Sequence, residues 1–471
     1  MNVLKGLAAS NAAYVWSTIA RLASTAILAR LISPEEMGIW TLGFAVIGLF
    51  QIIRDFGTAT YIQTAPELTP EDVKTCNGIQ LVVGITFFTL FVFGASHIAS
   101  FYREPRVANA IYVLAISFLI IPLSSTTFST LIREGRFALK STVELVGQLV
   151  FYASAVALAY NGASYMSAPI AIIVSQLSIV ALCLRFRNKV YPLRASLRNF
   201  RSVGRLSGTA LGVSVLQHVS DKAPDYILPR SQSFTQSSLY EKGINCIELV
   251  RMAVVEMIGS VLLSSLRMRS EAKPEIFSSL ASSTVLLTFL LAACGATILH
   301  FNAAEFLLTL FGPQWTAARE PFEILTIATP FICLTTFLTK IMYLKQLHTT
   351  VLKLALLTRI SIISVVLLLS TQELRVLASG VVVSEIVFAL IYSFACRKIV
   401  DWREIWLSLL VDTTVIVMLG FGVSALLLNL SVSNHFLSLG ASTIAILASV
   451  TIYFLVVRRS IVRRTRNVLN V

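Results

Sequence analysis

Charged side chains are scarce in this sequence. Asp, Glu, Lys and Arg make up 13% of the 471 residues, hydrophobic residues make up 56%, and the mean hydropathy is +0.79. Soluble globular chains carry charge on about a quarter of their residues, so this composition excludes an ordinary water-soluble protein. We therefore expect a lipid bilayer to be the main solvent of the chain.

The sequence also lacks the motifs of soluble enzymes. It contains no glycine-rich phosphate loop, no His-x-x-x-His metal motif and no G-x-S-x-G nucleophile motif. The six cysteines are scattered, without the paired spacing of zinc or redox sites, which favours buried packing thiols. These cysteines are Cys76, Cys183, Cys246, Cys294, Cys333 and Cys396. We predict no enzyme activity, no metal and no cofactor.

Apolar runs near 20 residues occupy most of the chain. Each is long enough to cross a hydrocarbon core of roughly 30 Å as a helix, which satisfies its own backbone hydrogen bonds in lipid. We predict an all-α integral membrane protein with about fourteen transmembrane helices. The predicted spans are residues 10–31, 38–63, 76–101, 107–131, 141–160, 164–184, 207–228, 237–265, 277–300, 318–343, 349–370, 376–396, 407–429 and 436–457.

Basic residues predict the orientation of these spans. The net charge is +14, and Lys and Arg gather at the ends of apolar runs, which is an orientation signal rather than a sign of nucleic-acid binding. The first run, residues 8–31, contains Arg21 and leads to Ser33 and Pro34 instead of a cleavage site, so we interpret it as a span. The positive-inside rule then predicts a multi-pass protein of the bacterial inner membrane with both termini cytoplasmic.

A basic connector, residues 185–205, divides the chain after six predicted spans. It contains seven basic residues and no acidic residue. Two interpretations stay open: the charge only sets topology, or it also binds anionic lipid headgroups. The predicted organisation is an N-terminal lobe (residues 1–184), the cytoplasmic connector (185–206), a C-terminal lobe (207–396), and two extra spans with a basic tail (397–471).

Polar and ionisable residues gather in the first two predicted spans. An ionisable group inside a span costs at least ~2.5 kcal/mol, so it usually faces a protein interior or a wet cavity. The second span carries Arg54 and Asp55. The first span carries a stripe at helical spacing, made of Tyr14, Ser17, Thr18, Arg21, Ser24 and Thr25. These residues predict a hydrated, substrate-binding cleft.

A second group of charges lies in the seventh and eighth predicted spans. It suggests ion coupling, because desolvated carboxylates titrate at raised pH. The alternative is that these charges pair with one another as buried structural bridges, for instance Glu248 with Arg251. His218 lies in the same stripe, as a hydrogen-bonded structural residue or a proton carrier. The charged candidates are Asp221, Lys222, Asp225, Glu248, Arg251 and Glu256.

Three stretches carry a resemblance to a known family. They are ARLISPEEMGIWTLGFAVIGLFQIIRDFGTATYIQ at 29–63, LIREGRFALKSTVELVGQLVFYASAVALAYNGASY at 131–165, and LFGPQWTAAREPFEILTI at 310–327. The chain resembles polysaccharide exporters of the multidrug/oligosaccharidyl-lipid/polysaccharide superfamily, which include O-antigen and exopolysaccharide repeat-unit flippases. The resemblance implies two pseudo-symmetric six-helix lobes around a central cavity, plus two C-terminal helices. The match is loosest around Pro229 and Ser231.

The resemblance implies a flippase for a polyprenyl-pyrophosphate-linked oligosaccharide. Arg21 and Arg54 would balance the pyrophosphate while hydroxyl groups of the first span replace water around the sugars. The implied partners are the lipid-linked oligosaccharide, membrane lipids, a polysaccharide polymerase and a chain-length regulator. Two alternatives stay open: a cation-coupled multidrug exporter of the same superfamily, and a membrane-embedded polysaccharide polymerase or ligase. The latter needs a long outward loop, whereas the longest outward connection here, residues 300–321, is short and hydrophobic.

Overall fold

The computed structural model describes residues 20–55, 57–186, 194–199, 208–272, 277–429 and 435–456. Throughout these ranges the regular secondary structure is helical, which confirms the predicted all-α class. Residues 20–31 are helical and lead into α2. All six cysteines are buried and free, as expected for packing thiols.

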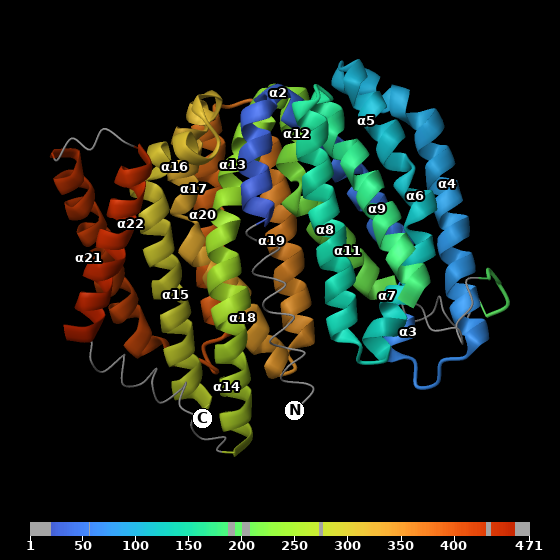
Figure 1. Ribbon diagram of the computed structural model, residues 1–471. Coiled ribbons are helices and arrows are strands. Elements are labelled where there is room, and N and C mark those ends of the chain that lie inside the picture. The colour runs from blue at the N-terminus through green and yellow to red at the C-terminus, as the bar shows by residue number, and fades with distance from the viewer. Residues whose placement is uncertain are drawn as a thin grey trace. The chain divides into compact units, whose positions relative to one another are not determined.

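The first half of the chain contains the helices from α2 to α12 (Figure 1). Their bounds are α2 (Pro34–Asp55), α3 (Thr58–Thr64), α4 (Pro70–Tyr102), α5 (Pro105–Ala115), α6 (Ser117–Ile120), α7 (Pro122–Arg133), α8 (Phe137–Tyr160), η1 (Ser164–Met166), α9 (Ser167–Phe186), α11 (Gly208–Asp221) and α12 (Ala223–Ser231).

The second half contains the helices from α13 to α22. Their bounds are α13 (Phe234–Arg251), the π-helix η2 (Met252–Ile258), α14 (Gly259–Ala272), α15 (Phe277–Phe301), α16 (Ala303–Leu310), η4 (Pro313–Ala318), α17 (Arg319–Thr326), α18 (Thr329–Leu344), α19 (His348–Leu369), α20 (Leu374–Ala395), α21 (Trp402–Asn429) and α22 (His435–Val456).

Many of these helices can cross a membrane. Within the described residues, eight are long and apolar enough, and the number rises to ten if each of two bent pairs counts as one span. The bends are 51° in both pairs, α5–α6 with α7 and η4–α17 with α18. Pro122 and Pro330 stand at the start of the helices after these bends, where proline removes a backbone donor. The protein is thus a multi-pass membrane protein, and fourteen spans stays a prediction.

The chain forms two compact units, Met1–Ser238 and Leu239–Val471. The first unit has an aromatic and aliphatic core built from α2, α4, α5 and α6, in which the rings of Phe91 and Phe118 stack with centroids 5.7 Å apart. Phe50 of α2 packs its edge against Phe91 at 4.9 Å. Such ring contacts contribute about 0.5–1.5 kcal/mol each beyond area burial.

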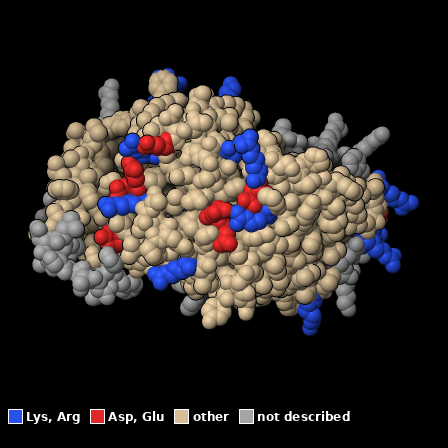
Figure 2. Space-filling model, turned by 90° about the horizontal axis from the view of Figure 1, so that it is seen from above, with Lys and Arg blue, Asp and Glu red and all other residues tan. Residues whose placement is uncertain are grey.

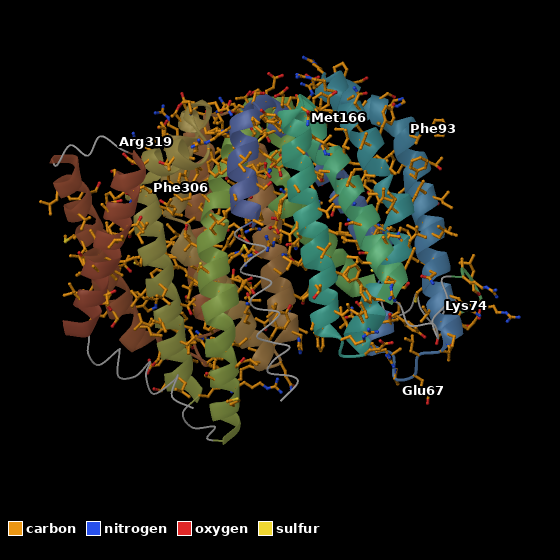
Figure 3. All side chains as sticks on the ribbon, in the orientation of Figure 1. Glu67, Lys74, Phe93, Met166, Phe306 and Arg319 are labelled. Atoms are coloured by element: carbon orange, nitrogen blue, oxygen red, sulfur yellow. The ribbon has the colours of Figure 1, made fainter. Side chains whose placement is uncertain are left out.

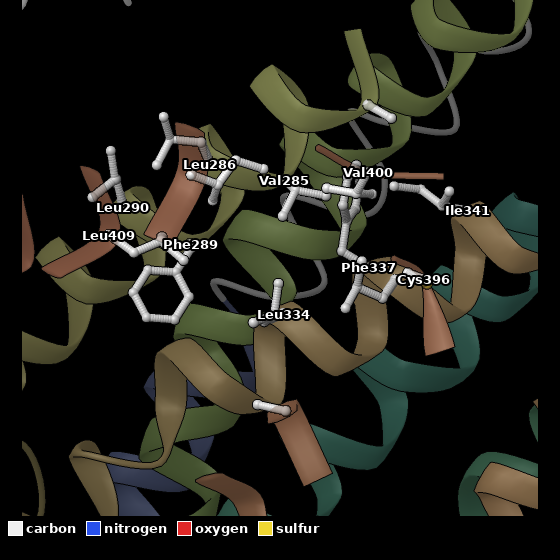
Figure 4. Close-up of a cluster of buried hydrophobic side chains, with 14 of the residues drawn as sticks. Val285, Leu286, Phe289, Leu290, Leu334, Phe337, Ile341, Cys396, Val400 and Leu409 are labelled. Carbon is white, nitrogen blue, oxygen red and sulfur yellow. The ribbon is translucent and has the colours of Figure 1, made fainter. Parts of the chain in front are cut away.

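The second unit has its own core (Figure 4). Val285 and Phe289 of α15 pack there with Leu334 and Phe337 of α18. Val400, after α20, belongs to the same cluster. The core therefore joins helices that lie far apart in the sequence.

On the face that Figure 2 shows, some charged side chains lie in small groups of mixed sign and some basic side chains stand alone. In the first unit, Arg106 forms ion pairs with Glu104, at 2.8 Å, and with Glu35. In the second unit, Arg319 pairs with Glu323 at 2.6 Å. Exposed pairs of this kind contribute little to stability, roughly 0–1 kcal/mol.

Candidate functional site

The predicted stripe of the first span is described only in part. Tyr14, Ser17 and Thr18 lie outside the described residues, so their predicted role stays a prediction. Arg21 is partly exposed on the helix of residues 20–31, and its charge acts on Tyr152 of α8. Thr25 is partly exposed one turn further on.

Arg54 and Asp55 form an ion pair at the end of α2. Nε and Nη2 of Arg54 donate to Oδ1 of Asp55 at 3.2 and 2.5 Å. The Arg54 side chain is 3% exposed, whereas that of Asp55 is 46% exposed. Nη1 of Arg54 is buried and meets no hydrogen-bond acceptor within the described part of the chain. The pair is therefore neutral, but one guanidinium nitrogen remains available to a further acceptor.

Side chains in and around this part of the first unit, mostly amides and hydroxyls, form a set of buried and half-buried hydrogen bonds, which we call the polar cluster. Nε2 of Gln80 donates to Oγ1 of Thr58 at 2.5 Å and to Oγ of Ser125 at 3.0 Å. Nε2 of Gln51, one turn before Arg54, donates to Oγ of Ser117 at 3.1 Å. The full cluster consists of Gln51, Arg54, Asp55, Thr58, Asn77, Gln80, Ser117, Ser125 and Thr126.

Two breaks in helical structure place these side chains together. Gly57 has φ 66°, a left-handed conformation that glycine adopts without strain, and it separates α2 from α3. Directly after it, Oγ1 of the fully buried Thr58 donates to the carbonyl of Asp55 at 2.8 Å. On the other side, the bend before Pro122 turns Ser125 and Thr126 of α7 toward α4, where Thr126 donates to Oδ1 of Asn77 at 2.7 Å.

The polar cluster contains residues that the sequence analysis missed. Gln51, Asn77, Gln80 and Ser117 are uncharged and isolated in apolar runs, so neither a charge nor a polar stripe at helical spacing marks them. One signal was present: the run of hydroxyl residues at 124–130, SSTTFST, within an otherwise apolar span. Lys242 was missed as well, although it is 6% exposed and its amine lies 4.5 Å from the ring centre of Trp315.

The charged candidates of the second unit form one network. Nε of Arg251 donates to Glu248 at 2.7 Å, and its Nη1 reaches Glu256 at 3.3 Å. Lys340 of α18 pairs with Glu256 at 2.9 Å and reaches the carbonyl of Val255 in η2 at 3.4 Å. Two carboxylates thus face two cations, which is the mutual pairing that the sequence left open. Whether these groups couple transport to an ion stays a prediction.

The remaining charged candidates belong to the first unit. Lys222 pairs with Asp225 at 2.9 Å, and the Asp225 side chain is 3% exposed, whereas Asp221 is exposed. Nε2 of His218 lies 2.9 Å from the carbonyl of Ala45 in α2, so it must be the donor. This geometry corresponds to the structural interpretation of His218.

The second unit also contains an apolar cavity of about 370 Å³. Its walls come from α15, the bend between α17 and α18, and α21, and include Phe289, Phe301 and Phe331. None of the predicted site residues lines it. The cavity and the charge network are therefore separate features of this unit.

Solved structures of other membrane proteins share this fold. The solved structure of lipid II flippase MurJ in its inward closed conformation superposes with a TM-score of 0.78 at 11% identity, covering 94% of this chain and 98% of that one. An inward-facing multidrug resistance transporter of the MATE family, from the MOP superfamily, gives a TM-score of 0.64 at 13% identity, covering 81% and 94%. At these identities the likeness concerns the fold alone.

Curated relatives share part of the sequence. The succinoglycan biosynthesis transport protein ExoT of Rhizobium meliloti (strain 1021) is 25% identical over 310 residues, which are 64% of this chain and 61% of the relative. The lipopolysaccharide biosynthesis protein WzxC of Escherichia coli (strain K12) is 21% identical over 324 residues, 66% of this chain and 65% of the relative. The matches thus span less than two thirds of either relative.

A family of proteins described as polysaccharide biosynthesis proteins matches residues 27–320. The matched region contains two of the three stretches that carried the resemblance, at 29–63 and 131–165, and the first part of the third stretch, at 310–327. It also contains the polar cluster and most of the charge network. The predicted relationship is confirmed, and because the match covers more than half of its length, this chain belongs to the polysaccharide biosynthesis protein family.

Proposed function

We propose that this protein is a flippase that moves a polyprenyl-pyrophosphate-linked oligosaccharide repeat unit from the cytoplasmic to the periplasmic leaflet, for surface or exopolysaccharide synthesis. Relatives named for succinoglycan transport and lipopolysaccharide biosynthesis support this proposal, as does the fold shared with a lipid II flippase. In such a protein the lipid tail stays in the bilayer, and only the anionic and sugar groups need a polar path.

The observation that carries the proposal is the environment of Arg54. Its guanidinium is buried within a membrane helix and keeps Nη1 without an acceptor in the described residues, and its partner Asp55 accepts a hydrogen bond from Thr58 of the polar cluster at its backbone carbonyl. A guanidinium contacts phosphate oxygens in bidentate fashion and does not lose its proton, while amides and hydroxyls suit sugars. Arg54 is 3% exposed, so the proposal requires that the transport cycle expose it.

Arg21 supplies the second part of the proposed anion site. The Arg54–Asp55 pair is neutral, so the positive charge that balances a pyrophosphate has to come from another residue. Tyr14, Ser17, Thr18 and Thr25 are proposed to contact the sugars. Export of cationic drugs is less suited to this site, because an arginine-containing site repels cations.

We further propose that carboxylates of both units couple transport to a proton or cation gradient. Each of three carboxylates has a cationic partner, Lys222 for Asp225 and Arg251 for Glu248 and Glu256, and an incoming cation would compete with that partner. The proposed coupling residues are Asp221, Asp225, Glu248 and Glu256, with Lys222 and Arg251.

The proposed location is the bacterial inner membrane with both termini cytoplasmic. A polysaccharide polymerase and a chain-length regulator are proposed to act with the protein, because a flipped repeat unit has to be polymerised on the far side of the membrane. The transported lipid-linked oligosaccharide and the surrounding membrane lipids complete the proposed set of partners.

A vesicle assay tests the function directly. Purified protein in proteoliposomes should bring a fluorescent polyprenyl-pyrophosphate oligosaccharide to the opposite leaflet, where a quencher added outside distinguishes the two leaflets. The same lipid should move slowly in protein-free vesicles and in vesicles that carry Arg54→Gln. Transport of a cationic dye without any movement of the glycolipid would instead establish the drug exporter and refute the flippase.

A further inference from the structure

Residues 194–199, the described part of the basic connector, are bound to the first turns of α4; we call them the strap. The backbone N–H of Ser196 donates to the carbonyl of Lys74 at 3.0 Å, and Oγ of Ser196 donates to Glu71 at 2.7 Å. Nδ2 of Asn199 donates to Oδ1 of Asp72 at 2.7 Å. The strap is therefore a fixed element of the first unit.

Gly78 makes this docking close. A Cβ atom at position 78 would lie 2.1 Å from the carbonyl oxygen of Ser196, a distance that no side chain tolerates. Only glycine allows the strap backbone to lie directly on the helix. Replacement of Gly78 would consequently push the strap away from α4 without removing any of its charges.

The hydrogen bonds of the strap are made to α4 by Ser196 and Asn199, whereas its basic side chains are exposed. Arg194 and Arg198 are exposed, and neither forms an ion pair with any residue that the structure describes, although the charge of Arg198 acts on Glu71 from a distance. Leu197 between them is 55% exposed. The nearest acids of α4 are already engaged, Glu71 with Ser196 and Lys74, and Asp72 with Asn199 and Thr69. Two guanidinium groups and one leucine thus form an outward surface.

The depth of the strap in the bilayer follows from α4. The exposed apolar side chains of this helix begin at Val82 and end at Phe101, and include Phe93, which projects outward in Figure 3. At 1.5 Å per residue this band is about 29 Å long, the thickness of one hydrocarbon core. Gly78 lies four residues before Val82, or about 6 Å outside the core, which is the level of the headgroups.

We propose that the strap is a binding surface for anionic phospholipid headgroups. Arg194 and Arg198 contact the lipid phosphate, and Leu197 enters the edge of the acyl region. A guanidinium suits phosphate because its planar fork offers parallel hydrogen bonds. A lipid headgroup fits better than a free phosphate, since only a lipid gives the exposed leucine an apolar partner.

Lipid retention by the purified full chain tests this proposal. Native mass spectrometry or a lipid titration would compare phosphatidylglycerol with phosphatidylcholine, and inorganic phosphate would serve as the free-anion probe. R194Q/R198Q should weaken phosphatidylglycerol binding by about tenfold to thirtyfold, because each basic residue near an anionic surface contributes on the order of tenfold or less. Phosphatidylcholine binding should not change, and inorganic phosphate should not compete at millimolar concentration.

Two further variants distinguish binding by the strap from a general effect of positive charge on lipid binding. R103Q/R230Q removes the same charge near the other end of α4, where Arg103 follows the helix and Arg230 lies over the ring of Phe101, and should bind phosphatidylglycerol normally. Gly78→Val keeps both strap arginines but displaces the strap, and should behave as R194Q/R198Q does. Equal losses in both double variants, or none in R194Q/R198Q, would overturn the proposal. Because no transport is measured, either result leaves the flippase assignment to its own test.

Discussion

The ion pair of Arg54 and Asp55 is asymmetric at the level of single residues. Arg54 is 3% exposed and Asp55 is 46% exposed, so water can stabilise the carboxylate but not the guanidinium. Removing one partner of a buried pair is costly when the remaining charge stays buried, and much less costly when it reaches water. The two partners should therefore respond differently to neutralisation.

We expect Asp55→Asn to destabilise the protein by on the order of 3 kcal/mol, because it leaves a buried guanidinium without its carboxylate. Arg54→Gln should cost less, since Asp55 can be solvated. Thermal unfolding in detergent measures both variants, and the double variant should recover part of the loss of Asp55→Asn. Equal destabilisation by the two single variants would contradict this assignment of burial.

The variant that costs less stability, Arg54→Gln, should nevertheless cost the protein its function. Arg54→Gln should reach normal membrane abundance yet abolish complementation of surface polysaccharide, because the proposed pyrophosphate contact is lost. Arg21→Gln should do the same, and Lys at either position should rescue only in part, since an ammonium lacks the bidentate fork. Full complementation by both Gln variants at normal expression would exclude the proposed anion site.

Glu104 gives a prediction on pH, outside the membrane-spanning segments. Hydrogen bonds from the Arg106 side chain, at 2.8 Å, and from its backbone N–H, at 3.1 Å, lower the pKa of the Glu104 carboxyl. A lowered pKa in the folded state means that the stabilisation is fully present above the pKa of the unfolded chain, near 4.3, and is lost as the pH falls from there through the folded-state pKa. Glu104→Gln should thus lower the melting temperature at pH 7, and this effect should shrink progressively as the pH falls through the lowered pKa of the folded state. Glu67→Gln, at an exposed carboxyl, is the matched control.

At the scale of elements, apolar runs predict where helices lie but not where they break. The predicted span 38–63 is in fact α2, a turn at Gly57 and α3, and the predicted span 107–131 bends before Pro122. Hydropathy is averaged over a window, so it passes over a single turn. The breaks matter, because they bring Thr58, Ser125 and Gln80 together.

Contacts between residues that are distant in the sequence could not be predicted either. The pairing of Glu248 with Arg251 follows from helical spacing, whereas Lys340 meets Glu256 across 84 residues. Lys340 lies inside α18, so its charge is engaged in the fold and not only in orientation. Helix packing decides such contacts, and sequence periodicity carries no information on them.

The charge network and the acids of α11 and α12 give a prediction at the level of helices. Neutralising all four carboxylates, Asp221, Asp225, Glu248 and Glu256, should abolish the dependence of transport on an imposed gradient. Transport in vesicles with and without a proton or sodium gradient is the measurement, and a melting curve checks that the variant is folded. If gradient-dependent transport is unchanged, the carboxylates serve only as structural partners of Lys222, Arg251 and Lys340.

At the scale of the whole molecule, the distribution of basic residues predicts the orientation in the membrane. Each helix in lipid can be inserted in two directions, and the positive-inside rule selects the one that leaves Lys and Arg in the cytoplasm. The connector of residues 185–205 and the tail from Arg458 to Arg466 are the densest basic segments. In the first unit, the strap lies at the same end of α4 as Lys74, which Figure 3 labels near the lower end of that helix.

We expect reporter fusions after Arg205 and after Arg466 to give cytoplasmic signals. An even number of spans puts the two termini on one side of the membrane. Six spans before the connector put the connector on that side too. The sides of both termini and of the connector therefore depend on the number of spans. A fusion after Arg103, at the far end of α4, should give a periplasmic signal and serves as the control. A periplasmic signal after Arg205 or Arg466 would mean that an odd number of spans separates that position from a cytoplasmic N-terminus. The fourteen-span arrangement would then be wrong.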